Sequence, residues 1–364
     1  MNIKDLTIVL ENIAPLSLQE DYDNSGLLIG NNKNEINQVL ICLDVTPEVI
    51  EEAINTKSDL IIAHHPIIFK GLKRINGESL VEEVVYKAIK NDIAIYAIHT
   101  NLDNVSEGVN SILASKLGIQ NAQILSPLAG KLNKIVTFCP IDFADKVREA
   151  MFKAGAGHIG NYDSCSFNSQ GDGSFKALEN TNPFVGEKDK LHFEKEIRIE
   201  TIVPDFKVSS VIKSLISAHP YEEVAYDIYP LNNISSNTGA GMIGTLEKPM
   251  DISEYLKHVK NVLGINCVKH NKLINKKVEK VAICGGSGSF LINAAAKQKA
   301  DLFITGDIKY HDFFEHQGIM TIADAGHYET EQFTKELIHA ILTKKFPNFA
   351  IRISETNTNP VSFL

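Results

Sequence analysis

Short apolar runs alternate with helix-like segments through the first third of the chain, and this alternation restricts the fold more than any other feature. The sequence predicts strands over residues 38–43, 60–63 and 93–98, separated by helices over residues 46–56 and 79–91. Strands that alternate with helices in this way form largely parallel sheets. We therefore expect the α/β class, with ligands bound at the carboxyl ends of the strands.

The pattern changes in the middle of the chain and then returns. Two β-α units are predicted there, which favours a small ferredoxin-like α+β module. Between them lies a loop over residues 155–186 that is too long and polar for an ordinary connection. We expect a discontinuous α/β domain in two halves, residues 1–126 and 245–364, interrupted by an inserted module over residues 127–244.

Composition fits a folded, water-soluble protein and argues against two kinds of partner. Of the 364 residues, 44% are hydrophobic and 22% are charged, as in ordinary globular proteins. The net charge of -9 gives no general attraction to nucleic acid or to an anionic membrane. No apolar run could span a bilayer, and the first residues do not resemble a signal peptide. The five cysteines stand singly, which fits a reducing cytoplasm.

Several of the expected strands are followed by side chains that can bind a metal ion. His64 and His65 come directly after the second strand, and Asp103 follows the third closely. His327 and Glu331 follow the last strand and stand four residues apart, so a helix would place them on one face. Taken alone, the histidine pair could be incidental and the His-Glu pair a surface ion pair. Their shared position at strand ends favours a metal site instead.

The donor chemistry indicates the kind of site. Histidine and carboxylate donors without cysteine suit zinc, iron or manganese, and they disfavour a closed structural zinc site. Five donors exceed what one catalytic zinc needs, but they suit two ions that share a bridging carboxylate. Such ions lie about 3.5–4 Å apart and activate water for hydrolysis. We expect two divalent metal ions per subunit, with zinc as the first choice and iron or manganese as alternatives.

Six stretches spread over the whole chain resemble those of a known family: DYDNSGLLIG, IIAHHPIIFKGLKRI, YAIHTNLDN, CGGSGSF, GDIKYHD and GHYETE. The family is that of the GTP cyclohydrolase 1 type 2 homologues, also called NIF-three-like proteins. The insert is similar to that of the family's longer bacterial members, which resembles the PII and CutA folds. GAGHIGNYDSCSF and HPYEEVAYDIYPL are the stretches that carry this second likeness.

The resemblance implies a dinuclear metal site made of His64, His65, Asp103, His327 and Glu331, with Glu331 as the bridge. It places His65 and Asp103 on one ion and His64 and His327 on the other. It further implies a toroidal homohexamer in which the metal sites face an internal cavity. The family name points to ring opening of GTP as the reaction.

Other polar residues near the expected strand ends are candidates for catalysis or for lining the cavity. His311 is the candidate general acid or base, because a free imidazole titrates near neutral pH. His99 is either a second proton carrier or a structural partner of the metal ligands. The remaining residues expected to line the cavity are Thr100, Asn101, Lys309 and Asp312.

Two further motifs have competing interpretations. The loop at residues 285–289 follows a strand and precedes a helix, so it could bind an anion, but it lacks a P-loop lysine and a tight turn explains it equally well. In the insert, HPYEEV offers His219, Glu222 and Glu223. We favour a structural or oligomer-contact role there over a metal site.

Two functions follow from the sequence. The first is a dinuclear metal hydrolase that uses activated water on a nucleotide or a related phosphorylated or heterocyclic substrate. The alternative is a metal-binding oligomeric adaptor or regulator without hydrolase activity, whose insert senses a small molecule or a partner. An open position on each ion favours the enzyme, whereas ions fully enclosed by protein ligands favour the adaptor.

Overall fold

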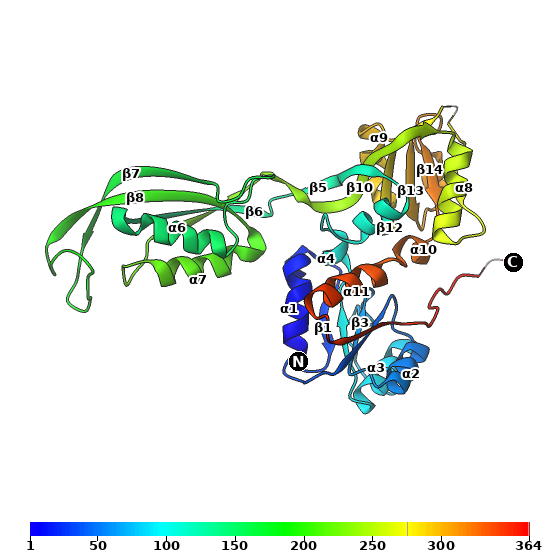
Figure 1. The fold of residues 1–364 in the computed structure, drawn as a ribbon, viewed down its shortest axis with the longest axis horizontal. Coiled ribbons are helices and arrows are strands. Elements are labelled where there is room, and N and C mark those ends of the chain that lie inside the picture. Colours follow the sequence, from blue (N-terminus) through cyan, green and yellow to red (C-terminus); the bar gives the residue numbers. More distant parts are fainter. Residues whose placement is uncertain (275, 363) are drawn as a thin grey trace. The chain divides into compact units, whose positions relative to one another are not determined.

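The computed structural model describes residues 1–274, 276–362 and 364, and the chain divides into two compact units (Figure 1). Unit 1 combines Met1–Pro127 with Asn237–Leu364, and unit 2 is Leu128–Ser236. Unit 2 ends eight residues earlier than the insert that the sequence predicts. The reason is that the returning chain already bonds to unit 1 there: the amide of Ser106 donates to the carbonyl of Asn237, 3.0 Å away.

The first sheet of unit 1 has five strands in the order β1-β4-β3-β2-β15. Their bounds are β1 Gly26–Ile29, β2 Gln38–Cys42, β3 Leu60–Ala63, β4 Ala94–Ala97 and β15 Ala350–Ile353. All neighbours are parallel except β1, which pairs antiparallel with β4 at the edge. Both faces are covered, by α1 (Ile3–Ile13) and α11 (Thr334–Lys345) on one side and α2 (Pro47–Thr56) and α3 (Leu80–Lys90) on the other. Burial on both faces explains why β3 is apolar at every position.

The second sheet of unit 1 has six strands in the order β11-β14-β13-β12-β10-β5. Their bounds are β5 Gln120–Ala129, β10 Ile234–Met250, β11 Lys269–His270, β12 Val278–Ser287, β13 Leu302–Gly306 and β14 Thr321–Asp324. The central strands β12, β13 and β14 are parallel. α5 (Val109–Lys116) and α8 (Ile252–Leu263) pack on one face, and α9 (Ile292–Lys297) packs on the other. The parallel strands of both sheets therefore present carboxyl ends at which ligands can bind.

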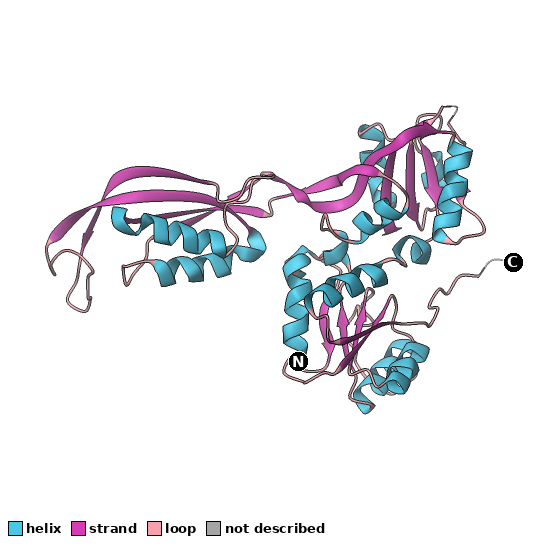
Figure 2. Cartoon of the chain, in the orientation of Figure 1, coloured by secondary structure: helices cyan, strands magenta, loops and turns pink. Residues whose placement is uncertain are grey.

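Unit 2 is a four-stranded antiparallel sheet with two helices. Its elements are β6 Leu132–Pro140, α6 Ala144–Lys153, β7 Ser166–Lys176, β8 Leu191–Pro204, α7 Val208–Ala218 and β9 Tyr226–Leu231. The strand order is β7-β8-β6-β9, and both helices pack on the same face of the sheet (Figure 2). The interpretation of residues 155–186 as one loop is wrong, because β7 lies within it. Most side chains of β7 are exposed, so this strand carries no apolar alternation, and its backbone pairing with β8 holds it in place.

The five cysteines are free thiols, and three of them are buried. Burial raises the pKa of the thiols of Cys42 and Cys284, so both stay neutral and act as small apolar side chains. Within the described part of the chain, we find no helix with the length and apolar character needed to cross a membrane.

Candidate metal centre

Strands from both sheets of unit 1 deliver the candidate donors to one place. β3 ends at Ala63 and is followed at once by His64 and His65. β4 leads into the one-turn helix α4 (Thr100–Asp103), and β14 leads into the short helix α10 (His327–Glu331). All three segments follow the carboxyl end of a parallel strand, where side chains are freed from the pleat and can converge.

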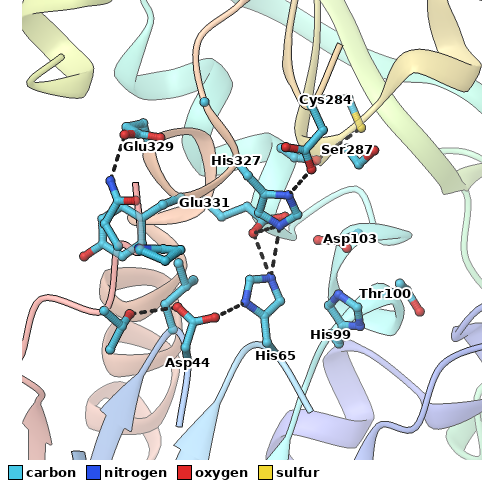
Figure 3. A pocket seen from close by; sticks show the side chains of 18 of the residues that line it. Asp44, His65, His99, Thr100, Asp103, Cys284, Ser287, His327, Glu329 and Glu331 are labelled. Atoms are coloured by element: carbon cyan, nitrogen blue, oxygen red, sulfur yellow. Dashed lines mark hydrogen bonds and ion pairs between the residues drawn. The ribbon is translucent and has the colours of Figure 1, made fainter. Parts of the chain in front are cut away.

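Glu331 lies at the centre of the cluster (Figure 3). Its Oε2 atom is 3.0 Å from His65 Nε2 and 3.1 Å from His327 Nε2. Its Oε1 atom is 3.7 Å from His64 Nε2, which in turn lies 3.7 Å from Oδ1 of Asp103. The structure thus brings together all five donors that the sequence singled out, with Glu331 positioned between the others.

The donors form two groups that share Glu331. The first group is His65, His327 and Glu331, and the second is His64, Asp103 and Glu331. His64, His65 and His99 form a third group, without a carboxylate, and the donor atoms of each group lie within 4.8 Å of one another. The resemblance implies a different assignment, with His65 and Asp103 on one ion and His64 and His327 on the other, and that assignment stays a prediction.

The imidazole rings near Glu331 are all oriented in the same way. Nδ1 of each ring faces an oxygen that can only accept: His64 faces the Ile98 carbonyl at 2.9 Å, and His65 faces Asp44 at 2.7 Å. His99 faces Asp23 at 2.8 Å, and His327 faces Asp307 at 2.6 Å. Nδ1 therefore carries a proton in each ring, which leaves Nε2 available as a donor to a cation.

Three buried atoms of the cluster have no hydrogen-bond partner among the described residues: His64 Nε2, Asp103 Oδ1 and Glu331 Oε2. The two short contacts of Glu331 Oε2 with imidazole nitrogens are ion-pair contacts. Unpartnered buried polar atoms are costly and rare in folded proteins. A divalent cation would satisfy all three, and imidazole and carboxylate are suitable ligands for zinc, iron or manganese.

The negative charges of Asp103 and Glu331 repel each other. Burial and the negative charge of Glu331 raise the pKa of Asp103 to about 7. Glu331 is itself buried, but the nearby imidazoles of His327, His64 and His65 hold its pKa well below the usual range. A cation between Asp103 and Glu331 would offset their repulsion and keep both ionised.

The two imidazoles of the first group have a strong affinity for protons. Burial disfavours their charged form, but the carboxylates around them outweigh burial. Contacts with Asp44 and Glu331 raise the pKa of His65 to about 10, and contacts with Glu331 and Asp307 raise the pKa of His327 to about 9. The surrounding charge therefore favours a positive species at this position, which a metal ion would supply in place of the protons.

The glycine-rich stretch CGGSGS belongs to this cluster. It forms the end of β12, where Gly286 has a left-handed backbone with φ of +63°. A Cβ atom at this position would lie 2.1 Å from Oε1 of Glu331. Gly286 therefore leaves the space that the Glu331 carboxylate occupies. Neither the anion site nor the simple tight turn that we considered describes this role.

A cavity of about 1200 Å³ borders the donor cluster. His65, His99, Asp103, His327 and Glu331 line it, whereas His64 lies fully buried behind them. The exposed aromatic rings of Phe69 and Phe290 form further parts of its wall. The cavity is large enough for a nucleotide-sized ligand.

Only one of the additional residues expected to line the cavity does so among the described residues, namely Thr100. Asn101 is fully buried and donates from Nδ2 to the carbonyl of Ala14. His311 lies in the exposed 3-10 turn Tyr310–Phe314, against the rings of Tyr310 and Phe314. Lys309 and Asp312 belong to the same exposed segment. The prediction of His311 as the acid or base therefore gains no support from the geometry, while His99 borders the cavity.

Sequence reasoning missed the carboxylates that orient the imidazoles. Asp44 follows β2, so the rule that identified His64 would also have identified it. Asp307 follows β13 in the same way, and Asp23 lies in the turn-rich DYDNSG stretch. Two residues near the C-terminus, Thr358 and Asn359, also line the cavity, and no sequence signal indicates them.

Unit 2 contains a separate cavity of about 550 Å³ with one buried carboxylate, Glu196. The hydroxyl of Tyr221 donates a hydrogen bond to Glu196 over 2.9 Å. His219 contacts the Phe138 carbonyl through Nε2, and Glu222 accepts a hydrogen bond from the amide of Asn182. Burial lowers the pKa of His219. These contacts are internal to unit 2, and no group of metal donors occurs there among the described residues.

Comparison with known proteins places the chain among relatives of the same length. The family model described as Duf34/NIF3 (NGG1p interacting factor 3) matches residues 1–360. A protein of Halalkalibacterium halodurans named "GTP cyclohydrolase 1 type 2 homolog" is 40% identical over 98% of this chain and 97% of its own. A Bacillus subtilis protein with the same name is 40% identical over 100% of this chain and 99% of its own. The crystal structure of a Bacillus cereus protein related to NIF3 superimposes with a TM-score of 0.88 at 40% identity, covering 100% of this chain and 99% of that one.

Proposed function

The chain belongs to the Duf34/NIF3 family, and we propose that it is a hydrolase that uses two divalent metal ions, zinc first among them. His65, His327 and Glu331 would hold one ion, and His64, Asp103 and Glu331 would hold the other. Ions in such a pair supply activated water and polarise the oxygen atoms of a substrate. The common orientation of the four imidazoles is the observation that supports the proposal most strongly.

His99 is the residue that we propose for proton transfer. It borders the cavity, and its ring lies 5.2 Å from the rings of His64 and His65. Asp23 holds its Nδ1, and hydrogen bonds from His99 and Thr100 keep the pKa of Asp23 far below its usual range in spite of burial. Asp23 therefore stays charged and fixes one tautomer, so Nε2 of His99 can accept or return a proton.

The walls of the cavity suit a flat heterocycle. The ring of Phe69 meets the His99 ring edge-on with 5.9 Å between centroids, and Phe290 offers a second exposed ring. Aromatic rings favour stacked or edge-on contacts with planar groups. The substrate that we propose is a nucleotide or a related phosphorylated or heterocyclic compound. GTP is the first compound to test, because the two relatives described above are named as homologues of a GTP cyclohydrolase.

The wider organisation completes the proposal. The order β-α-β-β-α-β and the strand order of unit 2 support a ferredoxin-like module of the PII/CutA kind. We expect a cytoplasmic toroidal homohexamer, as the resemblance implies. Light scattering on the purified protein should give six times the 40.2 kDa of one chain.

Metal analysis followed by a hydrolysis screen tests the function. We expect wild type to bind two ions per chain and to hydrolyse at least one nucleotide in the screen. Glu331→Ala should lose metal and activity together, His99→Gln should retain metal but lose activity, and the exposed Glu223→Ala in unit 2 should behave as wild type. If metal-loaded wild type hydrolyses nothing in the screen, the adaptor function replaces the hydrolase.

A further inference from the structure

The chain beyond β15 forms a segment that returns to the metal centre. Residues 354–359, which we call the C-terminal strap, have no helix or strand structure. The amide of Ser354 donates to the carbonyl of Ile41 in β2 over 2.7 Å, so the strap begins at the first sheet. Thr358 and Asn359, at its far end, line the cavity. The strap therefore connects the scaffold with the candidate site.

Glu52 of α2 anchors the start of the strap. Its carboxylate accepts hydrogen bonds from the hydroxyls of Ser354 at 2.5 Å and Thr356 at 2.6 Å. It also accepts from the backbone amides of Glu355 at 2.9 Å and Thr356 at 3.3 Å. These bonds outweigh the burial of Glu52 and lower its pKa, so the carboxylate is charged at neutral pH. Charge-assisted bonds of this kind are the strong ones, and four of them hold a segment without regular structure.

The far end of the strap contacts two residues that lie next to the first donor group, Asp44 and Glu329. Oγ1 of Thr358 donates to Oδ2 of Asp44 over 2.7 Å, while Oδ1 of the same carboxylate holds Nδ1 of His65. Nδ2 of Asn359 donates to Oε1 of Glu329 over 2.9 Å, and Glu329 lies in α10 between His327 and Glu331. The dashed contacts of Asp44 and Glu329 are visible in Figure 3. One segment thus reaches both the β2 end and the helix that carries the other two donors.

We propose that Thr358 is a positioning residue for the first donor group, and that the C-terminal strap belongs to the metal centre although it contributes no donor atom. This inference rests on the proposed metal site. Thr358 fixes one oxygen of Asp44, so the other oxygen stays directed at His65 Nδ1 and the ring presents Nε2 to Glu331 and His327. His64 of the second group does not depend on Thr358 in this way, because its Nδ1 bonds to the Ile98 carbonyl. Thr358 therefore acts on one ion and leaves the other unchanged.

The size of the effect follows from known metal sites. Loss of a group that orients a metal-binding imidazole typically lowers metal affinity by about 10–100-fold. Thr358 acts indirectly, through its hydrogen bond to Asp44, which in turn orients His65. We therefore expect the lower end of this range. Thr358→Val removes the hydroxyl at nearly constant shape, and Thr358→Ser keeps it.

Titration calorimetry with Zn²⁺ on the full-length protein tests the proposal. Wild type should bind two ions per chain, and Thr358→Val should weaken one of them about tenfold while the other keeps its affinity. Thr358→Ser should restore the wild-type pattern. Glu52→Ala, which releases the anchor, should weaken the same ion. Glu355→Gln is the matched control within the strap, because the exposed Glu355 contributes only its backbone amide to the anchor.

A double substitution identifies which ion responds. Thr358→Val should add nothing to the loss that His327→Ala causes, because both act on the same ion, but its effect should add to that of Asp103→Asn. If Thr358→Val binds both ions as wild type does, the strap proposal is wrong while the metal site stands. Failure of wild type itself to bind zinc would overturn both. Equal weakening of both ions would show a general disturbance of the fold and would also contradict the proposal.

Discussion

Two buried carboxylates, Glu331 in unit 1 and Glu196 in unit 2, lie in very different surroundings. They are 3% and 8% exposed, respectively, and each lies against a glycine whose Cβ would collide with it. Glu331 is approached by three imidazoles and by the carboxylate of Asp103. Glu196 has a tyrosine hydroxyl as its donor, in a cavity that includes the rings of Phe175 and Phe184.

The difference shows that burial of an acid does not by itself indicate a metal site. Glu196 is satisfied by a neutral donor within its own unit. Around Glu331, by contrast, His64 Nε2 and Asp103 Oδ1 are buried without a hydrogen bond among the described residues, and the Nε2 atoms of His64, His65 and His327 face the carboxylate. Convergent unpartnered atoms therefore distinguish the two places, and substitutions at matched positions can test the distinction.

The largest expected effect comes from the carboxylates themselves. Glu331→Gln removes the charge that both donor groups share, so we expect both ions to bind about 100-fold more weakly or worse, beyond the range for orienting groups. Glu196→Gln should leave zinc binding unchanged. Zinc content after dialysis against a buffered free-zinc concentration measures both variants. Retention of zinc by Glu331→Gln would remove the distinction between the two carboxylates.

The two glycines provide the next comparison. In Gly286→Ala the new methyl group competes with Oε1 of Glu331, and a left-handed backbone costs any residue with a Cβ atom roughly 1–2 kcal/mol. We expect both ions to bind about 10–100-fold more weakly, comparable to the loss of an orienting group. Gly173→Ala crowds Glu196 instead, so it should lower stability but not zinc affinity. Calorimetric titration of both variants checks this, and equal zinc binding in the two would contradict it.

A smaller effect on a single ion should follow from Asp307→Asn. Asp307 holds Nδ1 of His327, and asparagine tolerates its left-handed backbone of φ +56°. We expect one ion to weaken about 10–100-fold and the ion held by His64 and Asp103 to be unaffected. The counterpart in unit 2 is His219→Gln, which should change neither ion. A two-site analysis of the zinc titration separates these outcomes.

The smallest effect concerns unit 2 and stability alone. Tyr221→Phe removes the donor to Glu196 and should lower the free energy of unfolding by about 1–3 kcal/mol without affecting zinc. Burial and the neighbouring Glu196 raise the pKa of Tyr221 above the value near 10 of an unfolded tyrosine. Its contribution is therefore complete below pH 10 and is lost as pH rises above that value, since the unfolded chain ionises first. Between pH 8 and pH 11, the free energy of unfolding measured with urea should fall less in Tyr221→Phe than in wild type.

The sequence could predict the strand-end donors because their signal is local. An apolar run buried on both faces marks β3, and the polar residues directly after it are then conspicuous. The family resemblance found from these stretches is confirmed by the match over residues 1–360. Asp44 could have been found by the same rule, because it follows β2 at an equivalent position.

Other features depend on contacts between distant segments and leave no local pattern. The orientations of the His64 and His65 rings depend on Ile98 and Asp44, which lie far from them in the sequence. β7 is stabilised by pairing with β8 rather than by apolar burial, so residues 166–176 look like a loop. The position of Thr358 depends on the anchor at Glu52 and on the bond to Asp44, and both partners lie far from it in the sequence.

Anomalous diffraction from crystals of the zinc-loaded protein is the most direct test of the account. We predict two peaks per chain about 3.5–4 Å apart, one among His65, His327 and Glu331 and the other among His64, Asp103 and Glu331. A single peak, a peak beside Glu196, or a pair in which His65 shares its ion with Asp103 would contradict the account.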